Sequence, residues 1–392
     1  MLDNAQLARI HELLAEFDLD GWLIFDFRGQ NRVAAAVLGP EIVGTRRVYV
    51  LVPRIGVPTA LVHAIDNDLW RHWPAEWIKH IWVRREELEA HVVGLLGGKR
   101  LAAEYSPRNV IPYLDTLPAG VYEFLSGLGV HLVSSVDLVT RFCSVWTPRD
   151  LASHQRAAKA IAEIAGKGIA LAGDRARTAH PMTEYDLAEW IREQFKNEGL
   201  ITDNGPSVSF GPNSARNHYE PTPDEAEKII PGEMLLVDLW AKEPGGVYAD
   251  QTWMASIGAP KDRDTRIWET LRSARDAALA LITQRIRSGQ AISGAEADAA
   301  ARTQIELGGF RDSIQARTGH SIDRFGLHGF GPPIDDTETY DDRLLIPGVG
   351  FSVEPGIYLP GQTGARSEVN VHIGPTDALI TPENYQRDLI VV

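Results

Sequence analysis

Residues 234–254 read MLLVDLWAKEPGGVYADQTWM, two alternating apolar segments joined by a turn with Pro-Gly-Gly at 244–246. Alternation of apolar and polar residues is typical of strands, and proline and glycine at this spacing mark a tight connection. The segment therefore predicts an antiparallel hairpin. If the turn is centred near Pro244, Asp238 and Asp250 face each other across the hairpin, with Cβ atoms roughly 5 Å apart.

Two carboxylates this close repel each other and destabilise a sheet unless a positive charge lies between them. A divalent cation supplies that charge, so the hairpin predicts a metal site, with Thr252 on the same face orienting Asp250. The alternative is an ordinary hairpin whose acids face solvent. Leu236, Trp240 and Met254 alternate onto the face of the two aspartates, which favours a buried face and the metal site.

Further candidate ligands occur in later segments, and each is a weak signal by itself. Glu354 ends the apolar strand FSVE at 351–354, and Glu368 lies on the polar face of an alternating strand at 366–373. His320 occurs in TGHS (318–321) and His328 in LHG (327–329). Taken alone, the second strand is merely half-exposed, and a single histidine is more often structural than a ligand.

The N-terminal part of the chain differs in its pattern of apolar and helical segments from the part that contains the hairpin. Residues 1–146 alternate short apolar segments with helical segments, one of them at 109–128, which predicts an α/β domain. Thr147, Pro148 and Asp150 then form a helix-start signal, because threonine caps the helix and proline fits its first position. We place the domain boundary there.

The C-terminal part, residues 147–392, opens with long helices and continues with strands. The sequence predicts helices at 150–172 and 183–198, then strands and glycine-rich and proline-rich loops, with one more long helical section at 262–308. This order predicts an α+β domain with a mostly antiparallel sheet.

Composition and charge exclude several classes of function. The 392 residues include 53 acids and 39 bases, a net charge of −14, and no basic stripe that would neutralise nucleic-acid phosphates. Cys143 is the only cysteine, so we expect neither a disulfide framework nor a thiolate zinc site. No apolar run approaches the roughly 18 residues that span a membrane. We expect a soluble cytoplasmic protein that binds neither nucleic acid nor membrane.

The order Asp, Asp, His, Glu, Glu in one domain resembles the ligand set of the pita-bread metallopeptidases, which include methionine aminopeptidase, aminopeptidase P and prolidase. The matching stretches are LLVDLWAK…VYADQTW, TGHS…LHG, FSVEPGIY and ARSEVNV. The stretch VEPGIY is especially similar to prolidase and aminopeptidase P, and FDFRG (25–29) to a bacterial Xaa-Pro dipeptidase branch. DGWLIFDFRGQN (20–31) resembles the opening of the creatinase-type domain of this family, so the resemblance covers essentially the whole chain.

The resemblance implies both the fold and the metal ligands. A creatinase-like α/β domain (1–146) precedes an α+β pita-bread catalytic domain (147–392) with a curved, mostly antiparallel sheet. Two divalent metal ions are implied, with Asp238 chelating one, Asp250 and Glu368 bridging both, and His320 and Glu354 completing the second. These donors lack sulfur, which suits Mn(II), Co(II) or Zn(II), and the resemblance favours Mn(II). Glu354 is also the implied general base.

Substrate contacts are implied at further positions. His218 and His328 match two histidines that donate hydrogen bonds to the substrate carbonyl or the developing oxyanion. Arg366 matches an arginine that braces the bridging carboxylate or meets the substrate, although it could equally only neutralise the acidic cluster. Many prolidases carry an arginine soon after the second histidine, but the stretch GFGPP (329–333) has none. This leaves Arg343, Arg366 or Tyr219 for the substrate carboxylate.

We expect one function for the protein and leave three alternatives open. We expect dinuclear hydrolysis of Xaa-Pro bonds in short proline-containing peptides, foremost dipeptides, and the resemblance implies a homodimer. The alternatives are aminopeptidase P-like cleavage of longer peptides, a non-peptidase enzyme on the same fold, and an inactive binding module. Retention of all five ligands disfavours the non-peptidase enzyme, and the seven intact site positions, which include His218 and His328, disfavour the inactive module.

Overall fold

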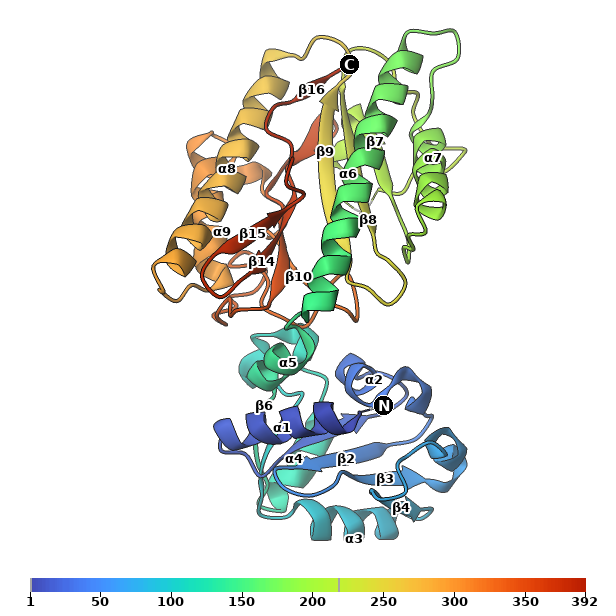
Figure 1. The fold of residues 1–392 in the computed structure, drawn as a ribbon, viewed down its shortest axis with the longest axis vertical. Helices are drawn as coiled ribbons and strands as arrows, with labels where there is room; N and C mark the ends of the chain where they lie inside the picture. Colours follow the sequence, from blue (N-terminus) through green and yellow to red (C-terminus); the bar gives the residue numbers. More distant parts are fainter. Residues whose placement is uncertain (1, 218) are drawn as a thin grey trace. The chain divides into compact units, whose positions relative to one another are not determined.

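The protein forms two compact units, Met1–Cys143 and Ser144–Val392. The structure is a computed structural model that describes residues 2–217 and 219–392 (Figure 1). The expected domain boundary after residue 146 stays a prediction. Within the described residues, none of the helices combines the length and the apolar character that a membrane crossing requires.

The N-terminal unit is built on a mixed sheet. Its strands are β1 (Gly21–Asp26), β2 (Val48–Pro53), β3 (Thr59–His63), β4 (Ile78–Trp82), β5 (Arg100–Ala103) and β6 (His131–Ser134), in the order β4-β3-β2-β1-β5-β6. The pairs β1–β2 and β2–β3 are antiparallel, and the other three pairs are parallel. The helices are α1 (Asn4–Glu16), α2 (Arg32–Leu38), α3 (Arg85–Leu96), α4 (Ala119–Gly127) and α5 (Val136–Cys143), with 3-10 helices at Pro40–Ile42, Ala64–Trp70, Pro107–Asn109 and Pro112–Leu114.

The helix predicted at 109–128 is wrong over its first half. That half contains only 3-10 turns, and α4 begins at Ala119, directly after Pro118. Proline lacks an amide hydrogen and pushes the preceding residue out of the helical region. Pro112 and Pro118 therefore interrupt the helix that the apolar spacing alone indicated.

A buried carboxyl group joins four segments of the N-terminal unit. Glu104 is 2% exposed and accepts hydrogen bonds from Trp22 Nε1 (2.8 Å), Asn31 Nδ2 (2.7 Å) and Ser135 Oγ (3.1 Å). Asn31 also caps the N-terminus of α2. Burial raises the pKa of Glu104 to about 7, although the three donors favour the carboxylate and oppose this shift.

The described residues of the C-terminal unit form four long helices and three groups of strands. The helices are α6 (Pro148–Ala176), α7 (Glu184–Asn197), α8 (Asp262–Arg287) and α9 (Gly294–Leu307), with 3-10 helices at Gly211–Ala215 and Arg311–Ser313. One sheet has the order β16-β9-β8-β7 and comprises β7 (Ser207–Phe210), β8 (Met234–Ala241), β9 (Ala249–Ser256) and β16 (Ile390–Val391). The second has the order β10-β11-β14-β15 and comprises β10 (Ser321–Ile322), β11 (Gly350–Val353), β14 (Val369–Ile373) and β15 (Ala378–Thr381). β12 (Gly356–Leu359) and β13 (Thr363–Arg366) form a separate pair.

The strands of this unit do not form one antiparallel sheet. β16 pairs with β9 in parallel, so the first sheet is mixed, whereas the described pairs of the second sheet are antiparallel. The single strand expected at 366–373 is also two strands, because the chain leaves the β12–β13 pair after Arg366 and enters the other sheet at Val369. Glu368 lies at this switch.

The helix starts follow the expected capping chemistry. The Thr147 side chain accepts from the Asp150 amide and the Thr183 side chain from the Asp186 amide, each with the reciprocal bond of a capping box. The long helical section at 262–308 is two helices, because Gly289 adopts a positive φ of 65° and Ser293 caps α9.

Strands β8 and β9 lie between two apolar cores, as their period of two requires. On one face Leu235, Val237 and Leu239 pack with α6 and α7. On the other face Leu236 and Met254 pack with α8, α9 and the second sheet. Asp238 and Asp250 share this second face, so alternation directs both carboxylates toward the space between the two sheets.

A buried histidine ties α6 to the strands. His154 is 1% exposed, with Nδ1 2.7 Å from the Tyr248 carbonyl oxygen and Nε2 2.7 Å from Thr381 Oγ1. Since a carbonyl only accepts, Nδ1 carries the hydrogen and Nε2 accepts from the threonine. Burial lowers the pKa of His154 to about 4 against the effect of the Tyr248 bond, and nearby His372 lowers it further.

Candidate metal centre

The two aspartates of the hairpin share a face but are not directly opposed. Asp238 pairs with Thr252, and Asp250 pairs with Trp240. The predicted register is wrong because the connection is centred on Gly245: the Gly246 amide bonds the Glu243 carbonyl at 2.9 Å. A shift of this size keeps both carboxylates on the same side, since the side-chain period is two.

Three of the expected ligands meet in one buried group. Asp250, His320 and Glu368 each offer an atom within 4.8 Å of the others. His320 precedes β10, and its Nδ1 lies 3.2 Å from the Ser321 carbonyl oxygen. Nδ1 therefore carries the ring hydrogen, which leaves Nε2 free to act as a ligand atom. Nε2 lies 3.3 Å from Asp250 Oδ2.

Glu354 and Asp238 border this group. Glu354 directly follows β11, and its Oε1 lies 3.4 Å from His320 Nε2. Asp238 contacts the guanidinium of Arg366. The structure thus brings all five expected ligands together, although only three of them meet within 4.8 Å.

Arg366 lies among the carboxylates rather than apart from them. Its Nε donates to Thr252 Oγ1 at 2.7 Å and lies 3.6 Å from Glu354 Oε2 and 3.7 Å from Glu368 Oε2. Together with its contact to Asp238, this gives one guanidinium facing three carboxylates. Arg366 therefore neutralises part of the acidic cluster, and its contact with a substrate stays a prediction.

Three supporting residues were not assigned these contacts from the sequence. Thr252, expected to orient Asp250, instead donates to Glu368 Oε2 at 2.7 Å. Asn370 Oδ1 accepts from the Asp250 amide at 2.9 Å. Ser352 Oγ accepts from the His320 amide at 3.0 Å and donates to Glu354 Oε1 at 2.8 Å. Ser352 and Asn370 lie two residues from Glu354 and Glu368, so strand alternation was the signal that could have found them.

Gly319 shows how closely the backbone packs beneath His320. A Cβ at this position would lie 2.0 Å from the Ser352 carbonyl oxygen, a backbone atom that cannot move aside easily. Glycine is therefore the residue that lets the segment bearing the histidine approach β11.

Burial opposes the ionisation of the carboxyl groups in this cluster, and nearby charges shift their pKa values further. Burial raises the pKa of Asp238 to about 6, with Arg366 opposing and Asp250 adding to the shift. Burial and the neighbouring carboxylates Asp250 and Glu354 hold the pKa of Glu368 well above its ordinary value. For Glu354, burial is outweighed by His320 and Arg366, which lower its pKa. One guanidinium is thus too little positive charge for this cluster.

The donor set fits divalent cations. All of the expected donor atoms are carboxylate oxygens or an imidazole nitrogen, the ligands that borderline and hard divalent metals prefer. Glu368 Oε1 is buried and has no hydrogen-bond partner within the described residues. A buried carboxylate oxygen without a donor is costly unless a cation binds it. Asp250, His320 and Glu368 are the residues that would hold such an ion first.

Comparison with known proteins places the chain in a family. The model of metallopeptidase family M24 matches residues 153–375, more than half of the chain. The chain belongs to metallopeptidase family M24. It is therefore a metal-dependent peptidase, a hydrolase, and its buried carboxylate and histidine group is consistent with divalent metal use.

Individual relatives are similar over most of their length. The probable dipeptidase PepE of Mycobacterium tuberculosis is 29% identical over 317 residues, 79% of this chain and 76% of the relative. The Xaa-Pro dipeptidase of Lactobacillus helveticus is 29% identical over 284 residues, 71% of each protein.

Solved structures show the fold of this M24 peptidase. Dipeptidase PepE from Mycobacterium ulcerans has a TM-score of 0.77 at 23% identity, covering 99% of this chain and 97% of its own. The prolidase from Thermococcus sibiricus has a TM-score of 0.69 at 22% identity, covering 100% of both chains. The M24 peptidase thus has the two-domain pita-bread fold of this dipeptidase and this prolidase.

The remaining expected substrate contacts have different surroundings. His328 is exposed, and its ring centre lies 4.2 Å from that of His320, so it borders the candidate metal centre. His218 lies outside the described residues. Tyr219 is buried, and its hydroxyl donates to Glu184 Oε2 at 2.7 Å.

Arg343 is engaged inside the protein. It is 6% exposed, pairs with Asp341 Oδ2 at 2.7 Å, and donates to the carbonyl oxygens of Phe330 (2.8 Å) and Gly331 (3.0 Å). Arg343 therefore holds the loop that follows His328. We drop Tyr219 and Arg343 as contacts of a substrate carboxylate, because their polar groups are bound to the protein itself.

Proposed function

We propose that this M24 peptidase hydrolyses Xaa-Pro bonds in short peptides, foremost dipeptides, with two divalent metal ions held by Asp238, Asp250, His320, Glu354 and Glu368. The observation that carries the proposal is the convergence of Asp250, His320 and Glu368 within 4.8 Å, bordered by the other two. The similarity to a relative named Xaa-Pro dipeptidase supports proline as the residue after the cleaved bond.

Charge supports two metal ions rather than one. The cluster contains four carboxylates, and the single guanidinium of Arg366 contacts three of them. Three negative charges are then uncompensated in a buried site, and one divalent ion cannot neutralise them. The sulfur-free donors suit Mn(II), our proposal for the metal, and also Co(II) or Zn(II). The cytoplasmic homodimer stays a prediction.

We assign catalytic roles to Glu354, His328 and His218. When bound, two divalent metals supply a polarised peptide carbonyl and a water of lowered pKa. Glu354 is held ionised by His320 and Arg366, so it is suited to accept the proton of the attacking water and return it to the leaving proline nitrogen. His328, beside His320, is placed to donate a hydrogen bond to the developing oxyanion, and we assign His218 the same role.

Replacement of Glu354 by glutamine tests this assignment. Glu354→Gln keeps the size of the side chain but removes the base, so we expect Ala-Pro hydrolysis to fall at least 1,000-fold, on the order of a lost base and ligand combined. Circular dichroism should remain that of the wild type. Glu193→Gln, at an exposed position of α7, is the matched control and should retain full activity. Near-normal activity of the Glu354 variant would contradict the mechanism.

Peptide length is tested by two substrates. Chromatography of Ala-Pro and Ala-Pro-Ala digests should show turnover of the dipeptide. Turnover of the tripeptide alone would refute the dipeptidase assignment and leave the metal centre intact.

A further inference from the structure

The N-terminal unit contains a pocket of about 510 Å³, a size typical of small-molecule sites. Phe25, Phe27 and Trp82 contribute aromatic walls, and Arg46 and Arg47 line the same pocket. None of these side chains belongs to the proposed metal centre, so what this pocket binds does not depend on peptide hydrolysis.

The two arginines carry charge that the described residues leave without a carboxylate partner. Arg46 Nη1 donates to the carbonyl oxygen and the hydroxyl of Thr45 at 3.3 and 3.0 Å. The recorded contact of Arg47 is with the ring of Trp82. Arg85, which also lines the pocket, is by contrast bound to Glu89 at 2.8 Å. Two cations without a counterion, in a chain with an excess of acids, favour an anionic ligand.

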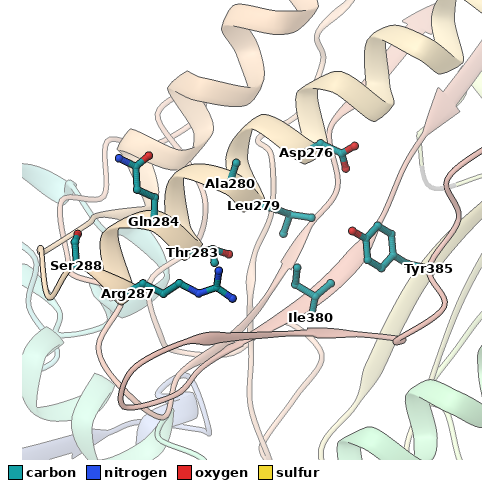
Figure 2. A pocket seen from close by; sticks show the side chains of 9 residues that line it. All are labelled: Asp276, Leu279, Ala280, Thr283, Gln284, Arg287, Ser288, Ile380 and Tyr385. Carbon is teal, nitrogen blue, oxygen red and sulfur yellow. The ribbon is translucent and has the colours of Figure 1, made fainter.

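A larger pocket elsewhere lacks this feature. The pocket of about 690 Å³ between α8 and the segment around Ile380 and Tyr385 also contains charged residues (Figure 2). There, however, Arg287 is bound to Asp377 through two bonds of 3.0 and 2.9 Å, and Asp276 is bound to Arg275 at 2.8 Å. Positive charge without a carboxylate partner thus distinguishes the N-terminal pocket from this larger one.

The aromatic wall holds one of the arginines in place. The guanidinium carbon of Arg47 lies 5.8 Å from the ring centre of Trp82, and the edge of His63 packs against the same ring at 4.4 Å. Trp82 is only 5% exposed, so its ring is fixed. A guanidinium stacked on a ring keeps its N–H groups in its own plane, where they remain free to bind a carboxylate through two bonds.

We propose that this pocket binds a small aromatic carboxylate, with its ring against Phe27 and the exposed Val83 and its carboxylate paired with Arg46 and Arg47. The planar fork of arginine matches the two oxygens of a carboxylate. Free inorganic phosphate would leave the apolar walls without a partner, and a neutral aromatic compound would leave the two cations unpaired.

Calorimetric titration of the full metal-loaded chain tests the proposal with four probes. Phenylacetate should bind at one saturable site per chain. Phenylacetamide, which lacks the charge, and acetate, which lacks the ring, should each bind at least tenfold more weakly, as should inorganic phosphate. Equal binding of the amide, or stronger binding of phosphate, would overturn the proposal.

Variants and metal removal locate the binding. The Arg46→Gln/Arg47→Gln double variant should lose at least tenfold in phenylacetate affinity while kcat/KM for Ala-Pro is unchanged. Arg54→Gln, at a partly buried arginine of this unit that pairs with Asp18, is the control and should bind normally. If the double variant melts early, Arg46→Gln alone tests the same point, because no ring contact is recorded for Arg46. Loss of phenylacetate binding after chelation of the metals would assign it to the metal centre and contradict the proposal.

Discussion

The buried carboxyl group of Glu104 makes the stability of the N-terminal unit depend on pH in an unusual direction. In the folded chain this group keeps its proton up to a pKa of about 7, whereas in the unfolded chain it loses it at its ordinary pKa of 4.5. The folded state therefore binds more protons between these two values. Its stability is greatest below pH 4.5 and falls as the pH rises to 7.

The size of the effect follows from the two pKa values. The gap corresponds to roughly 3.4 kcal/mol of unfolding free energy. Of this, about 1.4 kcal/mol is lost between pH 6 and pH 8. Glu104→Gln removes the titrating group, although its amide faces the Asn31 donor and lowers stability at every pH. The quantity to compare is therefore the change in unfolding free energy with pH, and not the unfolding free energy at a single pH.

His154 in the C-terminal unit makes the unfolding free energy depend on pH in the opposite direction. Its folded pKa of about 4 lies below the ordinary value of 6.5, so the unfolded chain binds more protons between these values. The stability that the neutral, buried His154 contributes is fully present above pH 6.5 and is lost as the pH falls toward 4. Between pH 8 and pH 6 the loss is about 0.8 kcal/mol, and His154→Gln should abolish it.

Urea unfolding of the full chain and its variants at pH 6 and pH 8 measures both effects. Relative to the wild type, Glu104→Gln should gain about 1.4 kcal/mol on going from pH 6 to pH 8, and His154→Gln should lose about 0.8 kcal/mol. Glu123→Gln, an exposed glutamate of α4, is the control. A Glu104 variant with the same pH slope as the wild type would refute the reasoning.

Three further substitutions probe the candidate metal centre and its support. Ser352→Ala removes the hydroxyl that links the His320 amide to Glu354, and it should weaken Mn(II) activation 10- to 100-fold in a metal titration of activity; unchanged activation would exclude this positioning role. Gly319→Ala forces a Cβ against the Ser352 carbonyl oxygen and should cost about 1–3 kcal/mol in urea unfolding. Arg343→Gln removes the guanidinium that pairs with buried Asp341 and should cost about 3–5 kcal/mol by the same assay, whereas a raised KM for Ala-Pro at unchanged stability would make Arg343 a substrate contact after all.

Local sequence signals predicted much of the framework. The six N-terminal strands and the capped starts of α6 and α7 are confirmed, because alternation and capping are properties of neighbouring residues. The hairpin of Asp238 and Asp250 was predicted, but its register was not, since the turn extends beyond Pro-Gly-Gly and is centred on Gly245.

Contacts between distant segments could not be predicted in the same way. Arg343 binds the loop at Phe330, and Tyr219 binds Glu184, so their apparent availability for a substrate disappears on folding. The network of Glu104 likewise joins residues from separate strands and helices. Sequence alternation shows which face a side chain takes, but only the tertiary fold decides which partner it meets.

Anomalous diffraction from crystals of the Mn(II)-loaded protein tests the central claim most directly. Data collected above the manganese absorption edge should show two peaks, about 3.5–4 Å apart, bounded by Asp238, Asp250, His320, Glu354 and Glu368. Absence of any peak at these side chains, or a single peak at full occupancy with excess metal, would contradict the dinuclear centre proposed for this M24 peptidase.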